Sequence, residues 1–353
     1  MTDLFYLSAR MRAMRGRMMR RPHYETLLAE PDLPAFAARL MEGPYAPTLE
    51  SAGAGNADPG RLEEAFRRQW SKTLTELSRR ADGDPREAVR IVLGFWDLHN
   101  LKTLLRGKAN GMPAEAIQAA LVPAGCIDEA VLVELLNQPD LRAAAALLVH
   151  RRDPAARALS AAMADYHEPR DLFILETVLE RDYFRRAFLD LDRLRLAEAD
   201  RAALGAFLRG QADRINLLTA LKAVEDRIAL LDRDRYYIPG GRIITPERFA
   251  RLLSARSLSE AFEVGSVYSA DLFRDLGEPV RGLSAVSRVE RRLDILIRRT
   301  LRFHARIDPL GLGAVIRGLL DYAAELSNLR MIFRGRLLDL PDRDFMPFLL
   351  IED

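Results

Sequence analysis

Apolar residues recur along most of this chain at the three- and four-residue steps of amphipathic helices. Leu101, Leu104 and Leu105, for example, stand on one helix face at positions i, i+3 and i+4. Alternation typical of a strand is never sustained, and its nearest candidate is RIITPERF at 242–249. Turn residues separate the helical stretches, as in GKANGMP at 107–113. The pattern predicts an all-α protein.

Three sequence markers recur in the same order, each of them three times. They are a Leu-Leu pair with a later leucine, a glutamate with apolar residues three and seven positions on, and an Asn-Leu pair with a base six residues after the asparagine. The first comprises Leu27-Leu28 with Leu33, Leu135-Leu136 with Leu141, and Leu252-Leu253 with Leu258. The second comprises Glu63 with Phe66 and Trp70, Glu176 with Leu179 and Tyr183, and Glu290 with Leu293 and Ile297. The third comprises Asn100-Leu101 with Arg106, Asn216-Leu217 with Lys222, and Asn328-Leu329 with Arg334.

This recurrence divides the chain into three similar helical repeat units of about 115 residues. We place the units at residues 1–125, 126–241 and 242–353. The first two stay in register without a gap, so that LVPAGCI at 121–127 aligns with YIPGGRI at 237–243. Solenoid repeats are usually shorter, about 20 to 50 residues, and units of this length are better suited to closure around an axis.

The repeated asparagines and bases have structural and functional interpretations. An asparagine inside a helix competes for backbone groups, so Asn100, Asn216 and Asn328 indicate buried hydrogen bonds that fix how two helices pack. Each base lies on another face of the helix, near its end. The three bases, Arg106, Lys222 and Arg334, either pair with neighbouring glutamates or form a ring at an opening shared by the three units, where they would bind a partner.

Composition narrows the class of protein. The chain has 353 residues, 49% of them hydrophobic, and its 53 basic and 51 acidic residues leave a net charge of only +2. This balance predicts a globular protein with mixed surface charge that binds no nucleic acid. The lone Cys126 excludes an intramolecular disulfide. No apolar run is long enough to span a bilayer.

The N-terminal segment is rich in arginine and methionine. Leu4, Leu7, Met11, Met14 and Met18 share one stripe of a helix, and we expect this stripe to pack on the rest of the fold. A helix that lies on a membrane surface, or a transit helix, is the alternative interpretation.

Motifs for enzymatic chemistry are missing. The chain contains no phosphate-binding loop, no G-x-S-x-G nucleophile turn and no H-E-x-x-H metal motif, and its five histidines are scattered. We therefore expect no catalytic residues, no cofactor and no metal. Two classes remain beside an enzyme of unknown type: a mechanical adapter in a larger assembly, and a helical-repeat scaffold that binds another protein partner.

The repeated motifs resemble the C subunit of bacterial and archaeal V/A-type rotary ATPases, the counterpart of the d subunit in eukaryotes. The likeness is strongest at FWDLHNLKTLLRGKANGMPAEAI (95–117) and AELSNLRMIFRGRLLDLP (324–341), and it includes the N-terminal YLSARMRAM. The middle repeat departs from this pattern, since Ala223 and Val224 replace the Gly-Lys and Gly-Arg of the outer copies.

The resemblance implies a funnel of three helical units about a pseudo-threefold axis. It implies a non-catalytic central-stalk adapter, peripheral at the cytoplasmic face of the membrane, that couples the rotating shaft of the catalytic head to the membrane rotor ring during ion translocation. The partners would be the rotor shaft subunits at one end and the cytoplasmic loops of the rotor ring at the other. The chain would act as a monomer within the larger complex.

Overall fold

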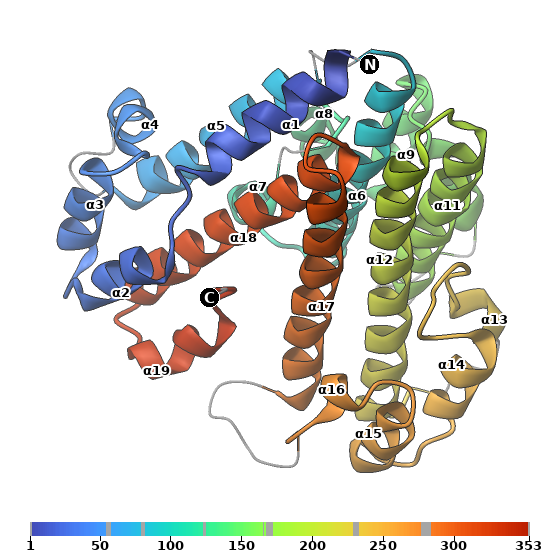
Figure 1. Ribbon diagram of the computed structural model, residues 1–353. Coiled ribbons are helices and arrows are strands. Elements are labelled where there is room, and N and C mark those ends of the chain that lie inside the picture. Colours follow the sequence, from blue (N-terminus) through green and yellow to red (C-terminus); the bar gives the residue numbers. More distant parts are fainter. Residues whose placement is uncertain are drawn as a thin grey trace. The chain divides into compact units, whose positions relative to one another are not determined.

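The computed structural model describes residues 2–53, 58–78, 82–122, 125–164, 166, 172–228, 233–276 and 284–351. Every regular element within these ranges is a helix (Figure 1), so the protein is all-α. The helices are α1 (Thr2–Arg15), α2 (Arg21–Ala29), α3 (Leu33–Met41), α4 (Ala46–Ser51), α5 (Pro59–Ser78), α6 (Gly83–Ala109), α7 (Ala114–Ala120), α8 (Glu129–Leu136), α9 (Leu141–His150), α10 (Ala156–Ala162), α11 (Leu172–Arg193), α12 (Glu198–Glu225), α13 (Arg233–Tyr236), α14 (Pro246–Leu253), α15 (Leu258–Ser266), α16 (Ala270–Phe273), α17 (Ala285–Ile307), α18 (Leu312–Leu337), α19 (Asp342–Phe345) and a final 3-10 turn, η3 (Met346–Phe348).

The chain folds into two compact units. The first unit comprises Met1–Ala81, Ala197–Phe207 and Gly265–Asp353, and the second comprises Asp82–Leu196 and Leu208–Val264. The first unit therefore joins segments from the two ends of the sequence.

One order of helices recurs three times after α1. Three short helices are followed by two long ones and a further short one in α2–α7, in α8–α13 and in α14–α19. The recurrence follows the sequence markers closely. The boundaries at 125 and 241 and the common axis stay predictions.

The leucine markers lie where the first short helix of each series ends and the second begins. Each Leu-Leu pair lies in the last turns of α2, α8 or α14, and the third leucine is the first residue of α3, α9 or α15. Polar residues cap these second helices, since Asp32, Asp140 and Ser257 accept hydrogen bonds from backbone N–H groups in the first turn. The marker thus records two short helices, each with one buried face, and a cap between them.

The core of the first unit forms around α18, which contacts α1, α3, α5 and α17. Leu7 and Met11 of the N-terminal stripe are fully buried. The helices α1 and α18 approach closely, because a Cβ atom at Gly318 would lie 2.6 Å from the Met11 side chain. The prediction that this stripe packs on the fold is confirmed, although α1 ends before Met18.

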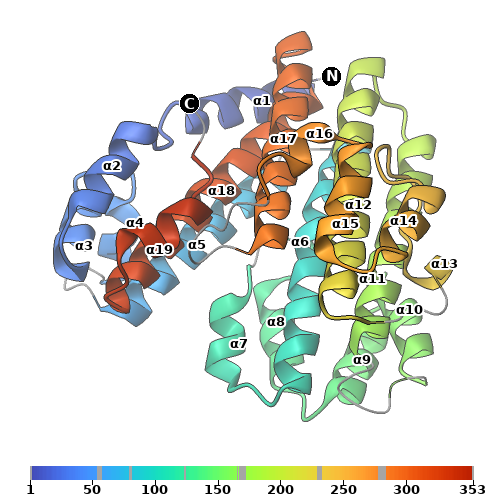
Figure 2. The same ribbon diagram turned by 90° about the horizontal axis from the view of Figure 1, so that it is seen from below.

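The core of the second unit is built on the packing of α6 against α11. Tyr183 from the second marker is buried, and its hydroxyl donates a hydrogen bond of 2.8 Å to the Ile91 carbonyl. A Cβ atom at Gly94 would lie only 3.3 Å from this ring, so the glycine leaves room for it. Figure 2 shows α6 and α11 running along each other within this unit.

Two other sequence expectations meet the structure differently. The nearest strand candidate, residues 242–249, contains Thr245, whose side chain caps α14 and so begins a helix. The stretch ESAGAGNADPG at 50–60 is rich in Gly, Ala, Asn and Pro, which predicts an exposed loop. It lies partly outside the described residues, and its described ends belong to α4 and α5.

Candidate functional site

The three repeated asparagines make the same pair of hydrogen bonds. Each is buried in a long helix, and its amide both donates to and accepts from the backbone of one residue that lies 22 positions later. Asn100 holds Val122 at 2.7 and 2.8 Å, Asn216 holds Ile238 at 2.8 and 2.7 Å, and Asn328 holds Leu350 at 3.2 and 2.7 Å. The predicted buried hydrogen bonds are present. The partner is an extended segment rather than a second helix, so the prediction was wrong on that point.

In the second unit, an aspartate three residues before Asn100 and before Asn216 binds the backbone a few residues beyond the partner of that asparagine. Asp97 accepts hydrogen bonds from the backbone of Cys126 and Ile127, and Asp213 accepts from three successive N–H groups at residues 242–244. A Cβ atom at Gly241 would lie 2.4 Å from Asp213 Oδ1, and one at Gly125 would collide with Asp97. This crowding explains why glycine occurs at both aligned positions.

The base after Asn100 is joined to the glutamate marker of the next repeat. Arg106 donates from Nε and from a terminal nitrogen to the two carboxylate oxygens of Glu176, at 2.5 Å each. Lys102, one turn earlier, binds both Glu176 and Glu180. The Glu176 side chain is only 8% exposed, whereas that of Arg106 is 56% exposed. The pair therefore anchors a buried carboxylate and leaves much of the guanidinium facing solvent.

The base of the third repeat is joined in the same way to the first repeat. Arg334 contacts Glu63 at 3.0 Å, and Arg330, one turn earlier, contacts the other oxygen of Glu63 at 3.2 Å. Lys222 is exposed. The ion-pair interpretation thus holds for Arg106 and Arg334. Binding of a partner by Arg106, Lys222 and Arg334 stays a prediction.

The three helices that carry the repeated asparagines, α6, α12 and α18, end in the same cap. In each, one N–H beyond the helix returns to the carbonyl five residues before it, as in the bond from Met112 to Gly107. The residue before that N–H has a positive φ, which is 63° at Gly111, 54° at Arg227 and 49° at Asp339. Only the first repeat uses glycine for this left-handed position.

A buried network of charges lies within the first unit. Asp321 of α18 accepts from Arg298 at 3.0 Å and from Arg317 at 2.7 Å, and Arg15 of α1 lies 3.1 Å from it. One turn later, Glu325 accepts hydrogen bonds from the Tyr45 hydroxyl and from the Met19 backbone, both at 2.5 Å. Burial raises the pKa of Glu325. These contacts connect three segments of the unit through α18.

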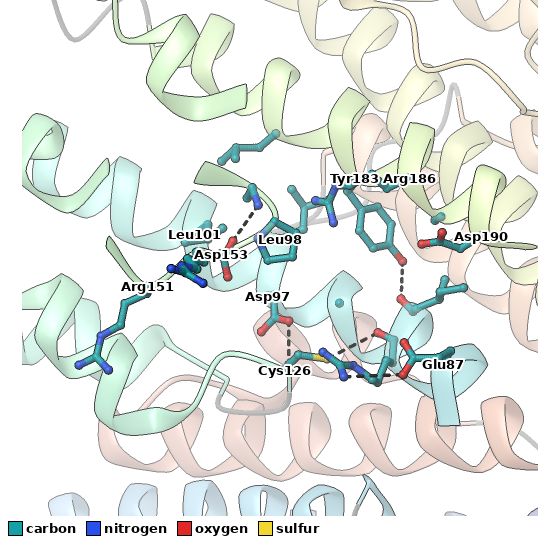
Figure 3. A pocket seen from close by; sticks show the side chains of 18 of the residues that line it. Glu87, Asp97, Leu98, Leu101, Cys126, Arg151, Asp153, Tyr183, Arg186 and Asp190 are labelled. Atoms are coloured by element: carbon teal, nitrogen blue, oxygen red, sulfur yellow. Dashed lines mark hydrogen bonds and ion pairs between the residues drawn. The ribbon is translucent and has the colours of Figure 1, made fainter. Parts of the chain in front are cut away.

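A pocket of about 430 Å³ opens between α6, α11 and the turn after α9 within the second unit (Figure 3). Figure 3 shows Asp97 bonded toward Cys126 and the Tyr183 hydroxyl bonded to a backbone oxygen. Burial raises the pKa of the Cys126 thiol to about 12 and that of Asp97 to about 6. A protonated thiol is a poor nucleophile, and the Asp97 oxygens are engaged by the backbone. The Asp97 carboxylate and the Tyr183 hydroxyl thus serve the fold.

The described residues contain neither a cluster of metal ligands nor a helix that could cross a bilayer. No group of three or more histidine, cysteine or acidic residues gathers there in a way that would hold a metal ion. None of the described helices combines the length and the apolar character that crossing a bilayer requires.

Comparison with known proteins decides the family. The model of a family described as ATP synthase (C/AC39) subunit matches residues 7–346. The chain belongs to this family. The match extends over all three series of helices and confirms the resemblance found in the repeated motifs.

Members of the ATP synthase (C/AC39) subunit family align along nearly their whole length with this chain. The C subunit of the V-type ATP synthase of Thermus thermophilus is 32% identical, and the alignment covers 96% of each chain. The V-type C subunit of Deinococcus radiodurans is 29% identical, with 96% of this chain and 89% of the relative covered. The A-type C subunit of Haloquadratum walsbyi is 26% identical, with 96% and 95% covered.

Several residues of the repeated site were not predicted from the sequence. Lys102 and Arg330 stand two positions after the asparagine. Each contacts the same glutamate as the base that follows four residues later, which is Glu176 for Lys102 and Glu63 for Arg330. Asp97 and Asp213 stand three positions before it. Their spacing from the asparagine was the available signal, because positions that recur in two repeats at a fixed offset are expected to have a shared role.

Proposed function

We propose that the chain is the non-catalytic central-stalk adapter of a V/A-type rotary ATPase or ATP synthase. In this role it couples the rotating shaft of the catalytic head to the membrane rotor ring during ion translocation. It is peripheral, at the cytoplasmic face of the membrane, and one copy works within the larger complex. The observation that carries this proposal is the family match over residues 7–346.

The contacts within the chain support a role that requires stiffness. Torque between two partners is transmitted only if the connecting body resists twisting, and close-packed interiors have this property. The paired hydrogen bonds of Asn100, Asn216 and Asn328 fix the segments that follow α6, α12 and α18. The Arg106–Glu176 and Arg334–Glu63 ion pairs each join helices of two different repeats. The proposed arrangement of three units about a pseudo-threefold axis would continue this scheme.

The three bases are proposed to face the shaft. Arg106 and Arg334 are held by their glutamates, yet their side chains are 56% and 52% exposed, and Lys222 is exposed as well. Held but accessible cations suit contact with an acidic partner, because little side-chain freedom is lost on binding.

The proposal is tested by purifying the affinity-tagged chain from its own cells under mild detergent. We expect the catalytic head, the shaft and the membrane rotor ring to be recovered with it. Recovery of an unrelated assembly, with none of these components, would instead support a scaffold protein.

A further inference from the structure

A surface of the first unit carries exposed apolar side chains between arginines. On α17 these are Phe303 and Ile307, which are 61% and 58% exposed, and on the following turn Leu310 is 39% exposed. On α1 they are Phe5 and Tyr6, at 49% and 39%. We call these residues, with the exposed Arg12, Arg299 and Arg306, the α1–α17 surface.

Hydrogen bonds fix the two parts of this surface beside each other. The Ser8 hydroxyl of α1 donates to the Leu310 carbonyl at 2.5 Å, and Arg12 donates to the Pro309 carbonyl at 3.1 Å. Figures 1 and 2 both show the start of α1 beside the turn between α17 and α18. The apolar side chains of the two helices therefore belong to one region of the unit.

The charge of this region differs from that of the whole chain. Basic and acidic residues nearly balance overall, but no acidic residue occurs in 295–307 or in 4–24. Along the exposed side of α17, Arg299, Phe303 and Ile307 follow each other at steps of four, with Arg306 beside them. The end of α17 thus presents alternating cations and apolar groups to solvent.

The corresponding helix of the second repeat provides a comparison. Near the end of α11, Leu189 is 43% exposed and stands between Arg185 and Arg193. There, however, Arg185 pairs with Asp182 at 2.7 Å, and Arg193 lies 3.9 Å from Asp190. The cations of α11 are balanced by carboxylates of their own helix. The last turns of α17 contain no such carboxylate beside the exposed Arg299 and Arg306, and the nearest acidic residue in sequence to Arg306 is Asp308, directly after the helix.

We propose that the α1–α17 surface binds the anionic headgroup layer of a phospholipid bilayer. Guanidinium groups bind phosphate oxygens well, and separate apolar side chains that project between cations enter the boundary of headgroups and acyl chains. Aromatic side chains such as Phe5 and Tyr6 are favoured at this boundary. A wholly apolar protein interface would not need the arginines, and an acidic peptide alone would not cover Phe303 and Ile307. This contact goes beyond the adapter role and requires neither the shaft nor the rotor ring.

The test is co-sedimentation of the full chain with vesicles of phosphatidylcholine, with or without about a quarter of phosphatidylglycerol. We expect binding only to the anionic vesicles, decreasing with salt. Replacing both Arg299→Gln and Arg306→Gln should lower the partition coefficient about thirtyfold, at about fivefold per arginine. Replacing Phe303→Ser and Ile307→Ser should lower it about tenfold or more. The matched control, Arg185→Gln with Leu189→Ser, should bind like the unmodified chain.

Three outcomes would overturn the proposal. One is equal binding to neutral and anionic vesicles, and another is binding that the α17 variants do not reduce. The third is absence of vesicle binding together with loss of protein partners from the α17 variants, which would make the surface a protein interface. As a control for folding, each variant should keep the helical circular dichroism spectrum and the melting temperature of the unmodified chain. Loss of lipid binding with intact recovery of the rotary complex would leave the adapter proposal standing.

Discussion

Glu63 and Arg334 are separated by 271 residues and form an ion pair at 3.0 Å within the first unit. The pair has the same form as Glu176 and Arg106, in which the glutamate of one repeat is bound by a base of the repeat before it. The contact between the third repeat and the first thus repeats the contact between the first and the second. The proposed closure of three units around an axis would require a contact of this kind between each repeat and the next.

The two members of this pair should differ in their importance for stability. Glu63→Gln removes the partner of both Arg330, whose side chain is 19% exposed, and Arg334, and should cost about 2 kcal/mol of unfolding free energy. Arg334→Gln should cost less than about 1 kcal/mol, since that side chain is half exposed. Urea unfolding measures both, with exposed Glu50→Gln as the control. Equal effects of all three substitutions would contradict the assignment.

The paired backbone hydrogen bonds of Asn100, Asn216 and Asn328, here called the asparagine clamps, predict a loss of stability when the amide is removed. Asn216→Leu leaves the N–H and the carbonyl of Ile238 without partners, so we expect a loss of about 1 to 3 kcal/mol. The same change at Asn100 or Asn328 should act similarly. Exposed Asn137, at the end of α8, provides the control, because its replacement by leucine should cost little. If all three clamp variants melt like the unmodified chain, the clamps contribute nothing to stability.

The helix ends predict variants that stabilise the protein. Arg227 and Asp339 occupy left-handed positions where Gly111 stands in the first repeat. Glycine at either position relieves backbone strain, and we expect each of Arg227→Gly and Asp339→Gly to raise stability by about 0.5 to 1 kcal/mol. Ala202→Gly, in the exposed interior of α12, should instead lower it by about 1 kcal/mol. Thermal melting distinguishes the two directions, and destabilisation by all of these glycines would refute the strain.

Asp97 predicts a specific dependence of stability on pH. Burial raises its pKa in the folded chain to about 6, above the ordinary value near 4, so the folded state binds the proton more tightly. The resulting stabilisation is complete below about pH 4 and is lost as the pH rises through 6. Asp97→Asn has no proton to lose. Its unfolding midpoint should therefore fall less than that of the unmodified chain between pH 5 and pH 8, and identical profiles would exclude this contribution.

Much of the fold followed from local pattern. The buried stripe of α1, the apolar partners of the glutamates and the leucine markers are short-range features, and each is set by helical spacing around one or two turns. The repeated order made the fold class predictable as well. The resemblance to the ATP synthase (C/AC39) subunit family rested on these same motifs.

The contact partners of the site residues could not be predicted from the sequence. Nothing in the spacing shows that Arg334 meets Glu63 or that Asn328 holds Leu350, because such contacts depend on how distant segments return. The role of Asp97 and Asp213 was obscured by the many other carboxylates that alternate with arginines on helix faces. A search for offsets shared between repeats would have distinguished them.

The adapter role is tested most directly by the ratio of ion transport to ATP hydrolysis in membranes that carry the rotary complex. We expect membranes that lack this chain to hydrolyse ATP in the catalytic head without moving ions, because the shaft turns without driving the ring. Adding back the chain should restore the ratio. Full ion transport coupled to hydrolysis in its absence would contradict the proposed function.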